Sequence, residues 1–282
     1  MLELNPQPLH DRIVYSIKRF FAEAGRERAV LGLSGGIDSA LVAALATEAL
    51  GKENVYGILM PSPYSTVHSV TDAVELADNL GISYGVLPIE GILEKFQSEL
   101  KELFEEEPKR LVIENLQARI RGVALMAWTN QNGSLLLNTS NKSEIAMGYG
   151  TLYGDLAGAL MVVADLYKLQ VYSVAKYINR ERRIIPESIL MKEPSAELSI
   201  DQKDSDTLPE YSLLDPVLHS LIEEKRSPAE LIEMGCEISL VNRITHLMNV
   251  SSFKAHQLPP MIQVGESPVL PPNKCIYYKI DG

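Results

Sequence analysis

The chain has 282 residues, of which 46% are hydrophobic and 22% charged, a balance typical of a globular protein with one large domain or two modest ones. The net charge of −11 argues against a broad nucleic-acid surface, and the sequence contains no run of the roughly 20 apolar residues that a membrane helix needs. The first eight residues carry neither a basic segment nor an apolar core, so we expect no secretory signal.

The first half of the chain alternates helical patterns with short apolar runs. Apolar residues at helical spacing predict a first helix over Leu9–Ala24, and apolar runs predict strands at Ala29–Leu33, Val55–Met60, Tyr84–Ile89 and Ser134–Asn138. Helical patterns fill the intervals at Ala40–Leu50, Ser69–Leu80, Gly91–Leu103 and Pro108–Gln131. This alternation predicts an α/β fold, a doubly wound and mostly parallel sheet with helices on both faces. Ligands in such sheets bind beyond the carboxyl ends of the strands, where the strand order reverses.

The loop Ser34–Ser39 reads Ser-Gly-Gly-Ile-Asp-Ser and joins the first predicted strand to the next helix. Glycines allow left-handed backbone geometry, and a helix N-terminus offers unpaired N–H groups to phosphate. Asp38 supplies a carboxylate suited to hold Mg²⁺ beside those phosphates. The spacing matches neither G-x-x-x-x-G-K-[ST] nor G-x-G-x-x-G. A Gly/Ser turn that merely caps a helix is the alternative interpretation.

The pattern changes after residue 150. Val171–Ile178 predicts a helix, and residues 186–216 are polar and interrupted by prolines, which suggests an active-site lid. Residues 258–282 form a proline-rich tail that either wraps a partner subunit or is mobile. The two cysteines, Cys236 and Cys275, lie far apart and form no C-x-x-C pair, which fits a reducing, cytoplasmic setting.

Five segments downstream of the loop Ser34–Ser39 also match a known protein family. They are Asn115–Gly122, Asn138–Asp155, Asp165–Leu169, Lys192–Leu198 and Ser251–Lys254. The loop resembles the SGG-x-DS pyrophosphate loop of the N-type ATP pyrophosphatase superfamily, and the whole series, from about residue 10 to about residue 260, resembles NAD⁺ synthetase. The resemblance implies an adenine nucleotide alpha hydrolase-like (Rossmann-like) fold and one synthetase domain over residues 1–282.

The family's reaction, as the resemblance implies it, amidates deamido-NAD in two steps. The nicotinate carboxylate of deamido-NAD attacks ATP with Mg²⁺ assistance to give an NAD-adenylate and pyrophosphate, and ammonia then displaces AMP. The resemblance assigns Asp38 and Glu144 to Mg²⁺, with Lys168 as the third catalytic residue. It assigns ATP contacts to Ser34, Gly35, Gly36, Asp38, Ser39, Thr139, Lys168 and Ser195, and deamido-NAD contacts to Arg119 and Lys254, with Arg121 as a near neighbour of Arg119.

Each assignment also has a structural alternative. Arg119 and Arg121 lie two residues apart on a predicted helix and so face different ways, which leaves at least one as a surface ion-pair former. Glu144 is also explained as a first-turn helix carboxylate, Lys168 as an exposed lysine, and Ser195 as a turn residue after Pro194.

Three departures from the family pattern concern the nicotinate end of the substrate. Some members carry a lysine, an aspartate and a histidine where this chain has Leu152, Ala159 and Phe253. Some stretches look more like the synthetase domain of glutamine-dependent members, which carry a separate glutaminase domain. Because the synthetase resemblance fills the chain from near its start, we expect the ammonia-dependent type, with a separate glutaminase partner left open.

Two other functions compete with NAD⁺ synthesis. One is another adenylating ATP pyrophosphatase, with a GMP synthetase-like enzyme closest in chemistry. The other is a non-catalytic nucleotide-binding regulator, which has no reason to keep both Asp38 and Glu144. The resemblance also implies a homodimer, with Pro108–Gln131 and Met147–Val163 as candidate interface segments.

Overall fold

The computed structural model describes residues 5–199, 202–265 and 277–278, and its centre is a seven-stranded sheet in which every paired strand runs parallel. The strand order is β3-β2-β1-β4-β5-β6-β7. The strands are β1 (Ala29–Gly32), β2 (Val55–Leu59), β3 (Ser83–Val86), β4 (Leu135–Asn138), β5 (Leu160–Met161), β6 (Met261–Ile262) and β7 (Tyr277–Tyr278). The predicted parallel α/β sheet is therefore confirmed.

The strand order reverses at β1. The chain runs outward from β1 through β2 to β3 and then returns to pair β4 with the other side of β1, in the register Ala29 to Leu135. The carboxyl ends of β1 and β4 therefore flank a crevice at which this fold class binds ligands. The loops that follow these two strands begin at Leu33 and Thr139.

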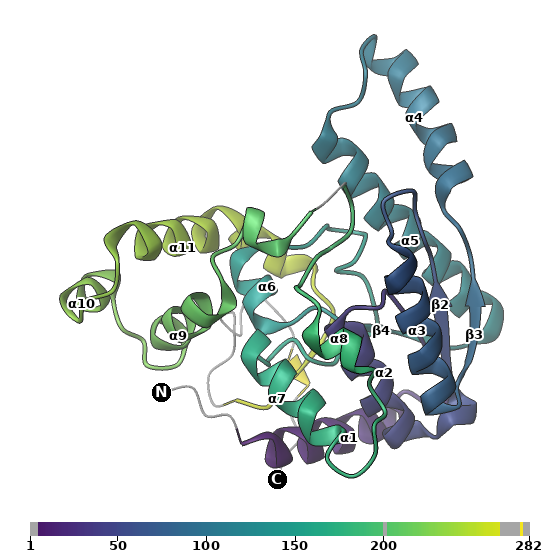
Figure 1. The fold of residues 1–282 in the computed structure, drawn as a ribbon, viewed down its shortest axis with the longest axis horizontal. Helices are drawn as coiled ribbons and strands as arrows, with labels where there is room; N and C mark the ends of the chain where they lie inside the picture. The colour runs from purple at the N-terminus through teal and green to yellow at the C-terminus, as the bar shows by residue number, and fades with distance from the viewer. Residues whose placement is uncertain (1–4, 200–201, 266–276, 279–282) are drawn as a thin grey trace.

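Helices cover both faces of the sheet (Figure 1). One face carries α1 (Pro6–Glu23), α2 (Ile37–Leu50), α3 (Val67–Leu80), α7 (Lys168–Ile178) and α8 (Glu187–Met191), whereas α4 (Glu90–Phe104) and α5 (Arg110–Asn132) lie on the other. Leu31 and Leu137 point into the first core, while their neighbours Val30 and Leu136 point into the second. Both faces are buried, which explains the continuous apolar runs.

A smaller group of helices packs beside the sheet, at the left of Figure 1. It consists of α9 (Tyr211–Ile222), α10 (Pro228–Glu233) and α11 (Ile238–Ser251), which share an apolar core with α6 (Lys142–Met147). Three short 3₁₀ turns complete the described elements: η1 (Lys52–Asn54), η2 (Asp204–Asp206) and η3 (Ser252–Gln257). None of the described helices has the length and apolar character needed to cross a membrane.

Two segments differ from the sequence-based expectation. Residues 186–216 are not one continuous loop, because they contain α8, η2 and the first half of α9. Pro216 lies inside α9, where the buried side chains of Leu214, Val217 and Leu218 anchor the helix despite the missing N–H. In the expected tail 258–282, Met261–Ile262 and Tyr277–Tyr278 form the strands β6 and β7, and residues 266–276 and 279–282 lie outside the described residues.

Candidate active site

The loop after β1 is closed by its own serines. The Ser34 and Ser39 hydroxyls lie 3.0 Å apart, Ser39 Oγ donates to the carbonyl of Gly36, and the N–H of Gly36 donates to Ser34 Oγ. Helix α2 begins at Ile37, three residues before the predicted start, so Asp38 lies in its first turn. Gly35 has φ +75°, and a Cβ there would meet the carbonyl oxygen of Ser69 at 2.2 Å. Only glycine fits this close approach to α3.

Three predicted residues from three elements meet at this loop. The Lys168 ammonium donates to Asp38 Oδ2 at 2.6 Å and to Glu144 Oε1 at 3.2 Å. Asp38 lies in the first turn of α2, Glu144 lies in the first turn of α6, and Lys168 is the first residue of α7. Asn141, the N-cap of α6, donates to Asp38 Oδ1 at 2.9 Å and accepts from the N–H of Glu144. Lys168 is 2% exposed, which contradicts its interpretation as a surface lysine.

Burial and neighbouring charges set the protonation of this cluster. Burial, supported by the charges of Asp38 and Asp204 and opposed by Lys168, raises the pKa of Glu144 to about 8. Burial alone would lower the pKa of Lys168, but the carboxylates of Asp38 and Glu144 outweigh it, so its pKa lies above the usual range. The lysine is therefore a fixed positive charge between Asp38 and Glu144.

The donor set fits a magnesium ion carried in with phosphate. Asp38 and Glu144 place two carboxylates on one ammonium, and Mg²⁺ in phosphate sites is commonly held by one or two carboxylates plus phosphate oxygens and waters. Within the described ranges, no group of three or more His, Cys, Asp or Glu side chains is arranged to hold a metal ion. A metal at Asp38 and Glu144 would therefore take its remaining ligands from a bound phosphate and from water.

A pocket of about 290 Å³ opens above the loop and the lysine. Ser195 and Thr139 line it, as does the buried Asp204 of η2. Most of the other predicted phosphate-site residues also line it, namely Ser34, Gly36, Asp38, Ser39, Glu144 and Lys168, whereas Gly35 packs against α3. The structure thus brings the predicted ATP-site residues together around one cavity.

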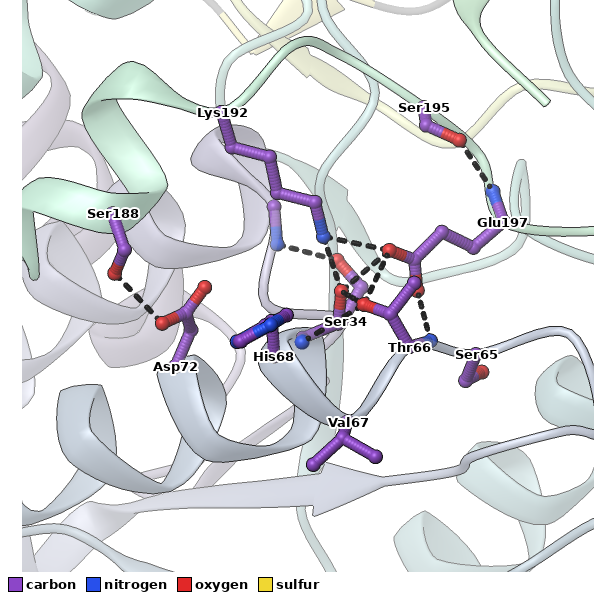
Figure 2. Close-up of polar contacts among 12 residues, drawn as sticks. Ser34, Ser65, Thr66, Val67, His68, Asp72, Ser188, Lys192, Ser195 and Glu197 are labelled. Atoms are coloured by element: carbon purple, nitrogen blue, oxygen red, sulfur yellow. Dashed lines mark hydrogen bonds and ion pairs between the residues drawn. The ribbon is translucent and has the colours of Figure 1, made fainter. Parts of the chain in front are cut away.

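The segment Lys192–Leu198 covers one side of the pocket and is fastened to the start of α3 (Figure 2). Glu197 accepts hydrogen bonds from the hydroxyl of Ser69 at 2.5 Å and from the N–H of Thr66 at 3.3 Å, and it pairs with Lys192 at 2.6 Å. Its backbone is left-handed, with φ 48°, an unusual conformation for a glutamate. Ser195 uses its hydroxyl within the segment, donating to the carbonyl of Gln202 and accepting from the N–H of Glu197.

The two predicted dinucleotide contacts lie outside this pocket. Arg119 is exposed on α5 and donates to the carbonyl of Leu152 at 3.3 Å. Lys254 donates to the carbonyls of Gly148 at 2.7 Å and Gly150 at 2.6 Å, at the end of α6. Arg121, in contrast, lines the pocket and donates to the carbonyl of Met60 at 3.0 Å. Burial lowers the pKa of Arg121 to about 10. Burying this guanidinium therefore costs more free energy than leaving Arg119 exposed at the surface.

The three departures from the family pattern also lie off the pocket lining. The carbonyl of Leu152 accepts from Arg119, the N–H of Ala159 donates to Leu136 at 2.8 Å, and Phe253 is 57% exposed. The side chains at these three positions therefore do not line the pocket at the phosphate loop.

Sequence reasoning missed four polar residues around the lysine: Asn141, Tyr149, Asp204 and Tyr211. Asn141 and Tyr149 lie inside the quoted segment Asn138–Asp155, but no chemistry had been attached to them. Asp204 lies in the polar stretch 186–216, which was interpreted as a lid without a role for this residue.

A family model described as NAD synthase matches residues 9–259. The glutamine-dependent NAD(+) synthetase of Synechocystis sp. is 49% identical over 93% of this chain and 47% of that protein. The corresponding protein of Thermotoga maritima is 43% identical over 90% of this chain and 45% of its own length. The chain therefore spans about half the length of the curated relatives it matches.

Two solved structures match over nearly their full length. The NH3-dependent NAD synthetase of Campylobacter jejuni is 32% identical with a TM-score of 0.72, covering 89% of this chain and 96% of that one. The NMN synthetase of Francisella tularensis is 28% identical with a TM-score of 0.76, covering 88% and 95%. The fold, the phosphate loop and these matches together show that the chain belongs to the NAD synthase family.

Proposed function

We propose that the chain catalyses the ATP-dependent amidation of deamido-NAD to NAD⁺, a ligase reaction that forms a C–N bond and releases AMP and pyrophosphate. The observation that carries the proposal is the meeting of the loop Ser34–Ser39 with Asp38, Glu144 and Lys168 beyond β1 and β4. Phosphoryl-transfer catalysis requires mainly positioning and charge neutralisation, which this arrangement supplies.

In the first step a carboxylate oxygen of the nicotinate attacks the α-phosphorus of ATP, and pyrophosphate leaves with the electrons of the broken P–O bond. Lys168 offsets the charge that develops on the phosphates, and Thr139 and Ser195 supply hydroxyls to ATP. Magnesium, held between Asp38, Glu144 and the phosphates, would neutralise further charge. The N–H groups and hydroxyls that receive the pyrophosphate come from Ser34, Gly35, Gly36 and Ser39.

In the second step ammonia attacks the carbonyl carbon of the adenylate, AMP leaves with the electrons of the C–O bond, and one proton passes to solvent. We propose ammonia as the immediate donor at this site, whether free or released by a glutaminase. The names of the relatives include both glutamine-dependent and NH3-dependent synthetases, so the physiological source is a separate question.

We further propose a homodimer with the dinucleotide near the subunit interface, contacted by Arg119 and Lys254. Support comes from an exposed stripe on α5, where Arg119, Val123 and Met126 share one face. Tyr153 lies close to this face and is 70% exposed. An apolar stripe beside an arginine is the composition expected of an interface. We place the enzyme in the cytoplasm because its proposed co-substrate ATP is found there and Cys236 is a free thiol.

The test measures product from deamido-NAD, ATP and Mg²⁺ with either ammonium or glutamine as nitrogen source. A parallel assay follows ATP–pyrophosphate exchange, which reports adenylation alone. We expect deamido-NAD-dependent exchange, and NAD⁺ formation with ammonium. Absence of exchange with deamido-NAD would overturn the proposal.

Nicotinate mononucleotide belongs in the same assay as a competing acceptor, because the chain also resembles an NMN synthetase. Exchange supported by the mononucleotide and not by the dinucleotide would move the substrate assignment to the smaller acid. Guanylate precursors test the GMP synthetase-like alternative. Nucleotide binding without exchange for any acceptor would favour the regulator.

A further inference from the structure

The guanidinium of Arg121 lies in the wall of the pocket without an ionic partner. It is partly buried, and its Nε donates to the carbonyl of Met60 at 3.0 Å. Within the described ranges this is the only hydrogen bond of the side chain, and no carboxylate oxygen lies within 4.0 Å of it. A guanidinium carries five N–H donors, so most of them are left for a ligand.

The two nearest carboxylates are already bonded to other groups. Asp155 accepts from the N–H of Thr151 at 2.6 Å, and Glu197 pairs with Lys192 at 2.6 Å. Both carboxylates attract Arg121 from a distance, yet burial has the larger effect and lowers the pKa of Arg121. A buried charge that is incompletely compensated is unfavourable, and an anionic ligand would compensate it.

Arg121 lies on the wall that leads to the phosphate loop. Leu125, one turn further along α5, approaches Gly32 together with Met60, since a Cβ at Gly32 would lie 3.6 Å from Leu125 and 3.4 Å from Met60. Gly32 ends β1, two residues before the loop Ser34–Ser39. Residues four apart share a helix face, so Arg121 adjoins this apolar patch. An apolar patch of this kind suits the adenine ring of a nucleotide.

The position of Arg121 selects one phosphate of ATP. In the proposed function pyrophosphate leaves into the loop Ser34–Ser39, so the β- and γ-phosphates lie there. Lys168 is held beside that loop by Asp38 and Glu144. The α-phosphate is bonded to the adenosine and therefore lies on the nucleoside side of the loop, towards the apolar patch. A planar guanidinium matches two phosphate oxygens, which a single ammonium does not.

We propose that Arg121 binds the α-phosphate of ATP and keeps this contact on the adenylate and on AMP. The assignment rests on the proposed function, in which the acceptor carboxylate attacks the α-phosphorus. The guanidinium would orient that phosphate and offset the charge that develops on its oxygens during the attack. The two arginines of α5 then have different ligands, because Arg119 lies outside the pocket.

The experiment measures the binding of AMP and of pyrophosphate by calorimetry, without any acceptor. Arg121→Gln removes the charge, and Arg121→Lys keeps the charge but not the planar fork. For Arg121→Gln we expect the affinity for AMP to fall at least about tenfold, as for loss of a charge-assisted contact, while that for pyrophosphate stays within about twofold. Arg121→Lys should be intermediate. Arg28→Gln is the control, since Arg28 is exposed just before β1, at the opposite edge of the sheet.

Thermal unfolding separates ligand binding from a structural role. Without nucleotide, the Tm of Arg121→Gln should be no lower than that of the wild type, because an incompletely compensated charge is removed. The rise in Tm that AMP produces should be smaller in this variant than in the wild type. A lower Tm without nucleotide, together with an unchanged affinity for AMP, would assign Arg121 to the fold and overturn the proposal.

Two further outcomes would also overturn it. Equal losses for AMP and pyrophosphate would indicate a general effect of charge rather than a contact with the α-phosphate. A weaker affinity for deamido-NAD with an unchanged affinity for AMP would assign Arg121 to the acceptor carboxylate. Absence of deamido-NAD-dependent ATP–pyrophosphate exchange in the wild type would instead refute the proposed function, and the AMP measurement does not depend on that result.

Discussion

Lys168 ties the site together because its ammonium joins carboxylates from two other elements. With a pKa above the usual range it stays charged over the whole physiological range, and it holds Asp38 and Glu144 at fixed positions before any ligand arrives. Preorganised charge of this kind costs no rearrangement during the reaction. The residue therefore serves both the architecture of the site and its chemistry.

Replacing Asp38 separates these two roles. We expect Asp38→Ala to abolish Mg²⁺-dependent adenylation, with a fall of about 10²-fold or more in exchange, because the metal and Lys168 both lose a carboxylate. Circular dichroism should show a folded protein, and Asp78→Ala at an exposed site on α3 serves as the control. Full activity of Asp38→Ala would refute the metal assignment.

The two arginines of α5 give a second residue-scale prediction. Arg119→Ala should raise the KM for deamido-NAD about tenfold and leave that for ATP nearly unchanged, as expected for loss of one charged contact. Arg121→Ala should instead lower kcat/KM for both substrates, because this guanidinium lines the pocket. Steady-state kinetics with each substrate varied in turn provides the measurement. Equal effects of Arg119→Ala on both substrates would remove Arg119 from the dinucleotide site.

For single residues, the sequence predicts which side chains face the ligand only where those residues belong to a recognisable motif. Asp38 was found from the loop motif Ser34–Ser39, and Glu144 from the resemblance of Asn138–Asp155 to the family. Asp204 was missed because its burial depends on how Leu208 and Tyr211 pack into the smaller core, which the sequence alone does not reveal. Whether Arg119 or Arg121 faces the pocket depends on the rotation of α5, which spacing alone does not determine.

Among the elements, the segment Lys192–Leu198 matters most for access to the pocket, because it covers one side of it. Its attachment to α3 runs through two side chains, since Glu197 accepts from Thr66 and Ser69 and Lys192 donates to the Ser69 hydroxyl (Figure 2). A carboxylate at a helix N-terminus is favoured by the helix dipole. We expect this contact to hold the segment over the pocket.

Neutralising Glu197 tests the attachment. Glu197→Gln should speed proteolytic cleavage between residues 192 and 203 about tenfold, because a charge-assisted contact is worth about 1.5 kcal/mol or more. The KM for ATP should rise in parallel. Glu193→Gln is the comparison variant, since Glu193 is exposed and its salt bridge to Lys203 lies at the surface. Identical cleavage rates for the two variants would show that Glu197 does not restrain the segment.

Asp215 connects three helices and predicts a pH effect on stability. From α9 it accepts from the Ser143 hydroxyl of α6 at 2.6 Å and from the Leu169 N–H of α7 at 2.8 Å. Burial raises the pKa of Asp215 to about 6, above its unfolded value of about 3.9. Because the folded protein binds the proton of Asp215 more tightly than the unfolded chain, protonation of Asp215 stabilises the fold. This contribution is complete below about pH 4 and is lost as the pH rises through 6.

Urea unfolding of the wild type and Asp215→Asn at pH 4.5 and 7.5 measures this contribution. The variant should be less stable at both values because it loses an acceptor. Its deficit should be about 2 kcal/mol larger at pH 4.5, where only the wild type gains from the raised pKa. A deficit that is constant or larger at pH 7.5 would contradict the assignment.

For the whole molecule, the alternation of strands and helices was predictable because each core strand is an uninterrupted apolar run buried on both faces. The two-residue strands β5, β6 and β7 were not, since they are defined by pairing with neighbours rather than by their own composition. Helix α11 also escaped prediction, as its apolar face packs only within the smaller core.

Assembly is the prediction that belongs to this scale. Val123 is 68% exposed on the apolar stripe of α5, and burying it against a second copy would remove that surface from water. We expect the wild type to sediment as a dimer and Val123→Glu as a monomer. Met234→Glu, at an exposed methionine on the distant group α9–α11, should remain dimeric. A monomeric wild type, or a dimeric Val123→Glu, would refute this interface.

The contact between Gly35 and the Ser69 carbonyl also limits how this sequence can diverge. A side chain at position 35 would need a left-handed backbone and would push α3 away from the loop, whereas Gly25, also left-handed, faces open space. Position 25 can therefore change to asparagine, which tolerates that conformation. No other residue fits at position 35 unless α3 also moves. Substitutions in the loop and at the start of α3 must therefore occur together.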